Sequence, residues 1–217
     1  MGTVIPCSAV LFDTDGTLVD STPLIERAAH AWAGGYGIDA EEFLAGAHGR
    51  RTSDRIAEFL PPLEVRAATE RLDALEAELL AEGGVVALPG VLDLLNAMNG
   101  LPWAIVTSMD TGQLRARTQI AGVPLPEVIV TADDVTHGKP DPEGYLLAAR
   151  RLGVPPEECA VIEDAPAGIR AGKAAGATVI AVTTSHPSGD LAEADLILPD
   201  LASVRATRTG LVLPENN

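Results

Sequence analysis

Short apolar runs separated by segments of helical periodicity dominate this sequence and constrain its fold most strongly. A continuous apolar run without alternating polar residues is typical of a strand buried on both faces of a parallel sheet. Strands that alternate with helices predict a Rossmann-like, doubly wound α/β domain. The predicted strands are 8–12, 103–107, 128–130, 159–162, 178–182 and 196–198, and the predicted helices are 91–99, 111–121, 142–152 and 165–175.

The segment from about residue 22 to residue 83 breaks this alternation. It contains helical periodicity but no strand-like run, and Pro61-Pro62 divides it. A segment of about 60 residues is too long for a loop between a strand and a helix. It predicts a small α-helical cap domain, residues 21–87, inserted after the first predicted strand into an α/β core formed by 1–20 and 88–217. Residues 204–213 predict a terminal hairpin.

The chain is strongly acidic, with a formal net charge of −16 from 15 basic and 31 acidic residues. Such a charge disfavours nucleic acid and anionic membranes as partners. It would also repel a phosphorylated substrate. A phosphate site in this chain would therefore need concentrated positive potential from a metal ion, a placed cation or helix N-termini.

Neither end of the sequence nor its interior predicts a membrane segment. No run approaches the roughly 20 apolar residues that cross a bilayer, and the first residues lack the basic flank and apolar stretch of a signal peptide. Cys7 and Cys159 lack metal-ligand spacing, and we expect two reduced, buried thiols. These features predict a soluble cytoplasmic protein. For the oligomeric state, which these features do not address, we take a monomer as the default.

Asp13 and Asp15 directly follow the first predicted strand. Residues two apart in an extended chain point the same way, so both carboxylates face the crevice where open α/β sheets bind ligands. Two carboxylates directed at one point require a cation between them or a proton on one of them. An acidic turn that merely closes a strand is the alternative interpretation. A calcium loop is disfavoured, because a strand precedes the motif and no Glu stands at the twelfth position.

Three later positions also combine strand or helix ends with reactive groups. Thr107 and Ser108 end a strand where a hydroxyl and free N–H groups can cradle phosphate, although either could simply be a helix cap. Lys139 is one of two lysines in a chain with 13 arginines, which favours a site needing a compact point charge over an incidental surface position. Glu163 and Asp164 end a buried strand, where a hard divalent cation such as Mg²⁺ is a suitable partner; Asp164 could also cap a helix.

A fourth candidate is the basic cluster in the cap segment. His48, Arg50 and Arg51 lie within five residues of an otherwise acidic chain, on either side of Gly49. The cluster is either a solvated loop or a cap loop that faces the site and recognises the substrate's leaving group.

Together these stretches resemble the haloacid dehalogenase superfamily over essentially the whole chain. Its four motifs are matched in order by DTDGTLVDS (13–21), VTS (106–108), GKPDP (138–142) and VIED (161–164). Within the superfamily, the chain resembles the β-phosphoglucomutase-like branch, in particular bacterial sugar phosphatases and yeast glycerol-3-phosphate and 2-deoxyglucose-6-phosphate phosphatases. The closer likeness rests on HGRRT (48–52), WAIVTS (103–108) and EDAPAGI (163–169).

The resemblance implies a Mg²⁺-dependent phosphatase acting through an aspartyl-phosphate. Asp13 is then the nucleophile and Asp15 the general acid and base. The implied metal ligands are Asp13, the main-chain carbonyl of Asp15, Asp164 and, directly or through water, Glu163. Lys139, Thr107 and Ser108 are implied to hold the transferring phosphoryl group. The implied substrate is a small sugar or polyol phosphate of the hexose-6-phosphate, hexitol phosphate or glycerol-3-phosphate type.

Two other functions remain open. A phosphosugar mutase of the β-phosphoglucomutase type shares the fold and the first motif, but needs a cap group for a second phosphate. Thr52 aligns with the arginine that the mutases use there, while Arg50 and Arg51 stand close by. A non-catalytic phosphate-binding module could dispense with Asp13 or Asp15, whereas this chain contains both.

Overall fold

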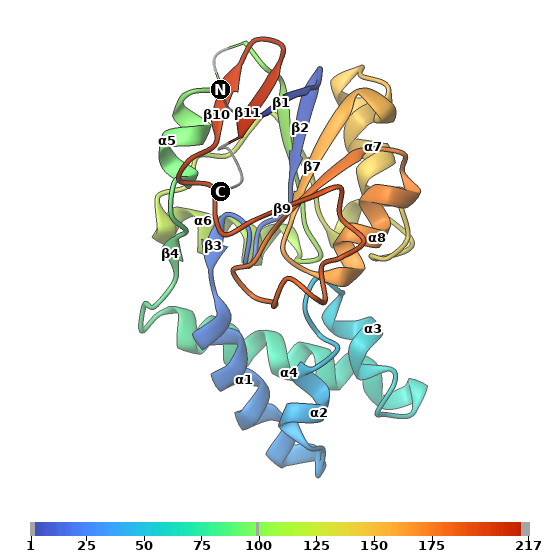
Figure 1. Cartoon of the computed structure of the whole chain (residues 1–217). Coiled ribbons are helices and arrows are strands. Elements are labelled where there is room, and N and C mark those ends of the chain that lie inside the picture. The colour runs from blue at the N-terminus through green and yellow to red at the C-terminus, as the bar shows by residue number, and fades with distance from the viewer. Residues whose placement is uncertain (1–2, 99, 214–217) are drawn as a thin grey trace.

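The computed structural model describes residues 3–98 and 100–213, and within them the main sheet has six parallel strands in the order β6-β5-β2-β7-β8-β9. The strands are β2 (Ala9–Phe12), β5 (Trp103–Val106), β6 (Val128–Val130), β7 (Cys159–Glu163), β8 (Thr178–Val182) and β9 (Leu196–Leu198). Each predicted strand is therefore present within a residue or two of its expected position. The predicted α/β class is confirmed (Figure 1).

Helices cover both faces of this sheet. They are α5 (Val91–Asn96), α6 (Thr111–Ala121), α7 (Glu143–Leu152) and α8 (Pro166–Ala174), with short 3-10 turns at Ala132–Asp134 and Pro156–Glu158. Because successive strand residues point to opposite faces, Phe12 packs in one cluster with Leu114 of α6. Leu11 packs in the other with Tyr145 of α7 and Ile169 of α8. Burial on both faces explains why the strand sequences are continuously apolar.

The inserted segment forms a separate helical layer below the sheet in Figure 1. Its helices are α1 (Thr22–Tyr36), α2 (Ala40–Leu44), α3 (Thr52–Ile56) and α4 (Pro62–Leu80). They enclose a hydrophobic cluster of their own around Trp32, Phe43 and Ile56, and the Trp32 indole donates to the Ala68 carbonyl at 2.9 Å. We refer to residues 21–87 as the cap. The separate cluster supports the proposed division into cap and core.

Three short strands lie outside the predicted set. β3 (Val19–Asp20) and β4 (Val86–Ala87) pair antiparallel where the chain enters and leaves the cap. β1 (Thr3–Pro6) pairs with β11 (Gly210–Leu213), which also pairs with β10 (Arg205–Thr207). The predicted terminal hairpin is thus confirmed, but it belongs to a three-stranded sheet. The first strand of the described chain is β1, and not the run that ends at Phe12. β1 was not predicted because it is largely exposed, and an exposed strand has no continuous apolar run.

Three smaller features also bear on the sequence predictions. Cys7 and Cys159 are free and buried, as predicted. Across 3–98 and 100–213, every helix is too short or too polar to traverse a bilayer. The predicted helix 91–99 ends at Asn96, and residue 99 lies outside the described residues.

Candidate active site

The carboxyl ends of three adjacent strands bring the predicted motifs together. β2 lies between β5 and β7, and Phe12 is in register with Ile105 and Ile162. The next residues along each strand are therefore neighbours at the sheet edge. By this register Asp13 lies between Val106 and Glu163, and Thr107 and Asp164 follow one residue farther along their chains.

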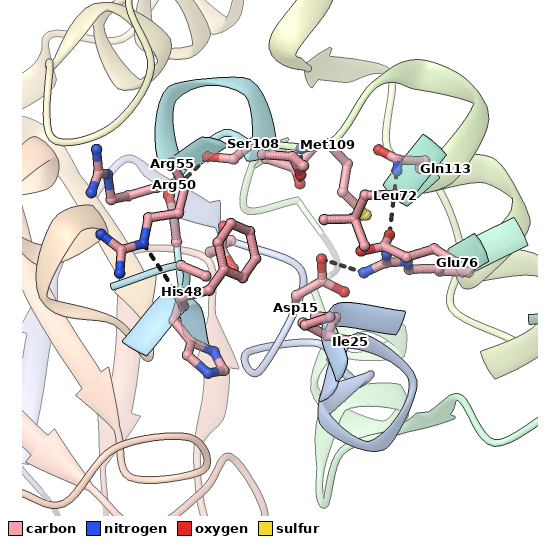
Figure 2. Close-up of a pocket in the computed structure, with 18 residues that line it drawn as sticks. Asp15, Ile25, His48, Arg50, Arg55, Leu72, Glu76, Ser108, Met109 and Gln113 are labelled. Carbon is pink, nitrogen blue, oxygen red and sulfur yellow. Dashed lines mark hydrogen bonds and ion pairs between the residues drawn. The ribbon is translucent and has the colours of Figure 1, made fainter. Parts of the chain in front are cut away.

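A cavity between the cap and this sheet edge contains both acids of the first motif (Figure 2). Its core wall includes Asp13, Asp15, Thr107 and Ser108, and its cap wall includes His48 and Gly49. The other lining residues are Ile25, Ala29, Phe43, Ala47, Arg50, Thr52, Arg55, Leu72, Glu76, Met109, Gln113 and Arg117. The walls combine apolar side chains with a few charged groups, as small-molecule sites commonly do.

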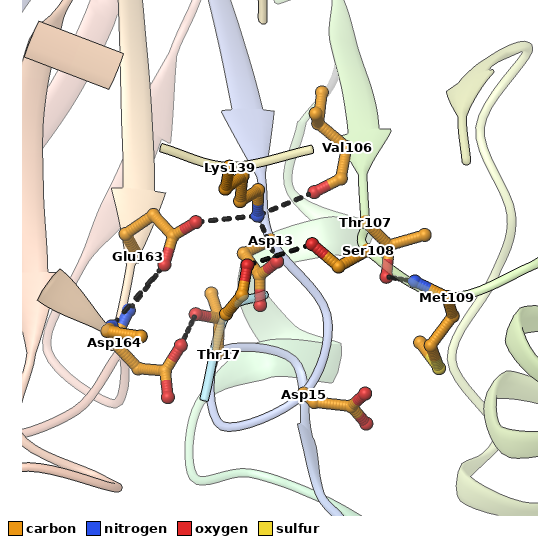
Figure 3. Close-up of polar contacts among 12 residues, drawn as sticks. Asp13, Asp15, Thr17, Val106, Thr107, Ser108, Met109, Lys139, Glu163 and Asp164 are labelled. Carbon is orange, nitrogen blue, oxygen red and sulfur yellow. Dashed lines mark hydrogen bonds and ion pairs between the residues drawn. The ribbon is translucent and has the colours of Figure 1, made fainter. Parts of the chain in front are cut away.

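Lys139 lies behind Asp13 in a cluster of buried charges (Figure 3). Its ammonium donates to Asp13 Oδ1, to Glu163 Oε1 at 2.7 Å and to the Val106 carbonyl at 3.1 Å. Three acceptors for three N–H groups fix the position of the ammonium. The sequence prediction that Lys139 is not an incidental surface residue agrees with its 6% exposure.

Both oxygens of Glu163 are engaged by protein groups. Oε1 accepts from Lys139 and, at 2.7 Å, from the Tyr145 hydroxyl, while Oε2 accepts from the Asp164 N–H at 3.1 Å. Gly168 leaves the room this carboxylate needs, since a Cβ there would lie 1.7 Å from Oε1. These contacts make Glu163 better suited to orient Lys139 than to bind a metal directly.

Negative charge exceeds positive charge in this buried cluster. Burial raises the pKa of Asp13 well above its ordinary range, against the opposing effect of Lys139. Burial and then the charge of Glu163 raise the pKa of Asp164 to about 7. For Lys139, burial alone would lower the pKa, but Asp13 and Glu163 outweigh burial and raise it. One ammonium among several carboxylates leaves an excess that a divalent cation would neutralise.

Asp13, Glu163 and Asp164 offer carboxylate oxygens that all lie within 4.8 Å of one another. Asp164 is oriented by the Thr17 hydroxyl at 3.3 Å and by Ser185. Gly16 adopts a positive φ of 76°, and a Cβ there would lie 2.1 Å from Asp164 Oδ2, so glycine lets the first motif approach this carboxylate. A cluster of oxygen donors fits Mg²⁺, a hard cation that prefers such ligands.

Asp15 faces the cavity beside Asp13 but has different partners. Ser21 donates to Asp15 Oδ1 at 2.6 Å, and Arg117 forms an ion pair with Oδ2 at 2.7 Å. Arg117 also pairs with Glu76 of the cap. The two acids of the first motif therefore line one cavity but have different partners, which come from different elements.

The cap loop at 47–52 closes over the sheet edge. Ser108 donates from its hydroxyl to the Gly49 carbonyl at 2.8 Å, and the His48 ring lies 5.1 Å from that of His186. Gly49 has a φ of 74°, and a Cβ there would lie 2.9 Å from the Ala165 methyl. The Ser108 side chain thus joins cap to core, whereas the Thr107 hydroxyl accepts from the Met109 N–H at 3.2 Å.

The two adjacent arginines of the cap loop, Arg50 and Arg51, differ in the groups that they contact. Arg50 lines the cavity and pairs with Glu58 at 2.6 Å. Arg51 donates to the core carbonyls of Thr136, at 2.9 Å, Ala132 and Val135. It does not line this cavity, but it lines a smaller one beside it that also includes Thr107, Ser108 and Lys139. Arg50 therefore lies on the wall of the main cavity, whereas Arg51 joins cap and core beside Thr107, Ser108 and Lys139.

Sequence reasoning missed Arg117, Glu76 and Tyr145. A signal exists for two of them, because Glu76 and Arg117 stand at helical spacing from Leu72 and Leu114, on the apolar faces of their helices. A charged residue on such a face needs a buried partner. The sequence gives no indication that these two charges pair with each other.

Comparisons with known proteins identify the family to which this fold belongs. The family model of the haloacid dehalogenase-like hydrolases matches residues 7–176. Hexitol phosphatase A of Escherichia coli is 46% identical over 207 residues, covering 93% of this chain and 95% of the relative. Glycerol-1-phosphate phosphohydrolase 2 of Saccharomyces cerevisiae is 38% identical, covering 91% of this chain and 84% of the relative. Its name specifies glycerol 1-phosphate, where we expected glycerol 3-phosphate.

A solved structure resembles the whole fold. CbbY of Rhodobacter sphaeroides, crystallised with phosphate, superposes with a TM-score of 0.77 at 30% identity, covering 90% of this chain and 95% of that one. β-Phosphoglucomutase of Clostridium difficile also gives a TM-score of 0.77, at 25% identity and with 90% and 92% coverage. The matched family model, the relatives and the shared fold show that this chain belongs to the haloacid dehalogenase-like hydrolase family.

Proposed function

We propose that this hydrolase is a Mg²⁺-dependent phosphatase of small sugar or polyol phosphates and that it works through an aspartyl-phosphate at Asp13. Relatives named as hexitol, glycerol 1-phosphate and 2-deoxyglucose-6-phosphate phosphatases support this class of phosphoric monoester hydrolase. The observation that carries the proposal is that Asp13 and Asp15 line one cavity, with Lys139 bonded to Asp13 from behind.

In the first step, Asp13 attacks the phosphorus and forms a P–O bond while the ester oxygen departs. Asp15, protonated at that moment, donates its proton to the departing alkoxide, which leaves as an alcohol. Lys139, the Thr107 hydroxyl and the N–H groups after β5 stabilise the negative charge on the remaining phosphoryl oxygens. Glu163 and Tyr145 keep Lys139 in place for this task.

In the second step, water hydrolyses the aspartyl-phosphate. Asp15, now a carboxylate, takes the proton from the attacking water, and the P–O bond to Asp13 breaks to release inorganic phosphate. The proton gained regenerates Asp15 for the next cycle. One residue serves both steps because Asp15 lines the same cavity as Asp13.

Asp13 and Asp164, with the main-chain carbonyl of Asp15, would hold Mg²⁺. When bound, it supplies positive charge that offsets the repulsion between the carboxylates and the anionic phosphate. Lys139 alone does not balance the carboxylates gathered there. The cap excludes bulk water, and its walls select the alcohol part of the substrate.

A phosphosugar mutase is the second candidate. Arg50 and Arg55 line the cavity, and a basic group on the cap is what a second phosphate requires. Both arginines already pair with Glu58, at 2.6 Å for Arg50, which favours the phosphatase. A mutase would convert a sugar monophosphate to its isomer, whereas a phosphatase releases inorganic phosphate.

A phosphate-release screen tests the proposal. Hexitol 6-phosphates, hexose 6-phosphates, 2-deoxyglucose 6-phosphate, glycerol 1-phosphate and glycerol 3-phosphate are each incubated with the protein and Mg²⁺, and then with EDTA. We expect release from at least one of these substrates with Mg²⁺, none with EDTA and recovery when Mg²⁺ is restored. Full activity in EDTA would refute the metal role, and isomerisation without net release would favour the mutase.

A further inference from the structure

A buried guanidinium joins the cap to the core at the edge of the cavity. Arg117 is on α6 of the core, and only 3% of its side chain is exposed. One end of the guanidinium pairs with Asp15 Oδ2 at 2.7 Å, and the other pairs with Glu76 Oε2 of the cap helix α4. The mechanism proposed above assigns no role to Arg117 or to Glu76.

The contacts around this pair fix its geometry. Gln113, one turn before Arg117 on α6, donates to Glu76 Oε2 at 3.4 Å and to Asp73 Oδ1 at 3.1 Å. In Figure 2, Asp15 lies to the left of Glu76 and Gln113, which lie close together. Two neighbouring positions of α6 thus engage two carboxylates of α4. The guanidinium is held by groups from both domains.

The same contacts leave the Asp15 carboxylate little freedom. Ser21 donates to its Oδ1 at 2.6 Å, while Arg117 occupies the Oδ2 side. Only Nη1 of the guanidinium meets this carboxylate, and the contact is an ion pair that lacks hydrogen-bond geometry. The buried positive charge therefore favours the orientation that keeps Oδ2 beside Arg117. Proton transfer to a departing oxygen requires the acid to be oriented toward it, so this restriction has a direct bearing on the first step.

We propose that Arg117 is the positioning residue for Asp15 and that Glu76 makes this positioning depend on the closed cap. Glu76 comes from α4, so the guanidinium has its second carboxylate only while the cap lies against the core. With the cap closed, Arg117 turns the Asp15 carboxyl toward the ester oxygen. With the cap open, Arg117 loses Glu76 and the orientation of Asp15 is released. This inference rests on the proposed function, because it assumes that Asp15 protonates the leaving group.

Leaving-group dependence separates positioning of the acid from general structural damage. An alkoxide leaves only with a proton, whereas p-nitrophenolate leaves readily without one. The ratio kcat/KM reports the steps up to phosphoryl transfer onto Asp13, so hydrolysis of the intermediate does not mask the effect. A variant with misplaced Asp15 therefore loses activity on an alkyl phosphate and retains it on p-nitrophenyl phosphate.

The experiment compares the variants Arg117→Lys and Glu76→Gln with the control variant Arg115→Lys. Arg115 lies on the exposed side of α6. For sorbitol 6-phosphate, we expect kcat/KM to fall about 100-fold in Arg117→Lys and about 10-fold in Glu76→Gln. For p-nitrophenyl phosphate, the expected loss is below about 5-fold in both, and Arg115→Lys leaves both substrates unchanged. Glu76→Gln is nearly isosteric and serves as the test if Arg117→Lys does not fold.

The outcomes distinguish the inference from the function on which it rests. Parallel losses on both substrates, or no loss on either, in a protein whose wild type is active would overturn the positioning role alone. A wild type that releases phosphate from none of the esters in the phosphate-release screen would overturn the proposed function and this inference with it. If the wild type hydrolyses another alkyl phosphate of that screen better, that ester replaces sorbitol 6-phosphate in the comparison. A selective loss on sorbitol 6-phosphate supports both.

Discussion

Lys139 donates to Glu163 at 2.7 Å, and the two side chains are buried together directly behind Asp13. A buried carboxylate that also accepts from Tyr145 and from the backbone cannot move freely, so it fixes the ammonium that it contacts. Lys139 in turn touches Asp13. Lys139 therefore connects the candidate nucleophile Asp13 to Glu163, the last residue of β7.

The chain offers a matched pair for testing the lysine, because Lys139 and Lys173 are its two lysines. Lys139→Met should lower kcat at least about 100-fold, since it removes a cation from the phosphoryl oxygens. Lys173 pairs with Asp195 on the exposed side of α8, so Lys173→Met should stay within about twofold of wild type. Steady-state phosphate release measures both, with circular dichroism as the check on folding. Equal losses in the two variants would contradict the assignment.

Mg²⁺ should stabilise the folded protein through the buried carboxylates. At a concentration 100 times its Kd, the free energy of unfolding should rise by about 2.7 kcal/mol. Asp164→Asn should abolish this gain, because Asp164 is one of the proposed ligands. Chemical denaturation with and without Mg²⁺ measures the effect independently of activity.

A second group of possible ligands, His137, Asp141 and Glu143, provides the control for this test. His137 and Asp141 are exposed, and Asp141→Asn should leave the Mg²⁺ effect intact. If Asp141→Asn removes the stabilisation and Asp164→Asn retains it, the proposed metal site is wrong.

Glu76 should make stability depend on pH. Burial raises the pKa of Glu76 to about 7, despite the opposing charge of Arg117. A raised pKa means that the folded state holds the proton more tightly. The stabilisation is therefore complete below about 4.5 and is lost as the pH rises through about 7.

Relative to Glu76→Gln, the wild type should therefore lose about 3 kcal/mol of unfolding free energy across this range. Urea denaturation of both proteins at a series of pH values gives the difference, in which the titrating groups that are not coupled to Glu76 cancel. A difference that is constant with pH, or that grows in favour of the wild type, would show that Glu76 does not titrate as its burial requires.

Most of the sheet could be predicted because its signals are local. The strands that end at Phe12, Val106 and Glu163 are buried on both faces, and that environment dictates an apolar run that can be read from the sequence. β1 was not predicted because it is mostly exposed. β3 and β4 were not predicted because each has only two residues, too few to show a periodic pattern.

The candidate site was predictable where residues follow strand ends and unpredictable where helices meet. Asp13, Thr107 and Glu163 follow from the order of the strands, once the sheet is known. Glu76 and Arg117 stand 41 positions apart, and their pairing depends on how the cap packs against α6. Local sequence patterns do not specify that packing. For the same reason, Arg50 and Arg51 could not be told apart before the structure placed one in the cavity and the other against core carbonyls.

The most direct measurement concerns phosphate on Asp13 itself. During turnover of a reactive phosphate ester with Mg²⁺, acid quenching followed by peptide mass spectrometry should find a phosphoryl group on the peptide that contains Asp13. Asp13→Asn should show no such group, retain the fold and lose at least about 10⁴-fold in kcat. Turnover in Asp13→Asn within tenfold of wild type, or a phosphoryl group on another residue, would contradict the account.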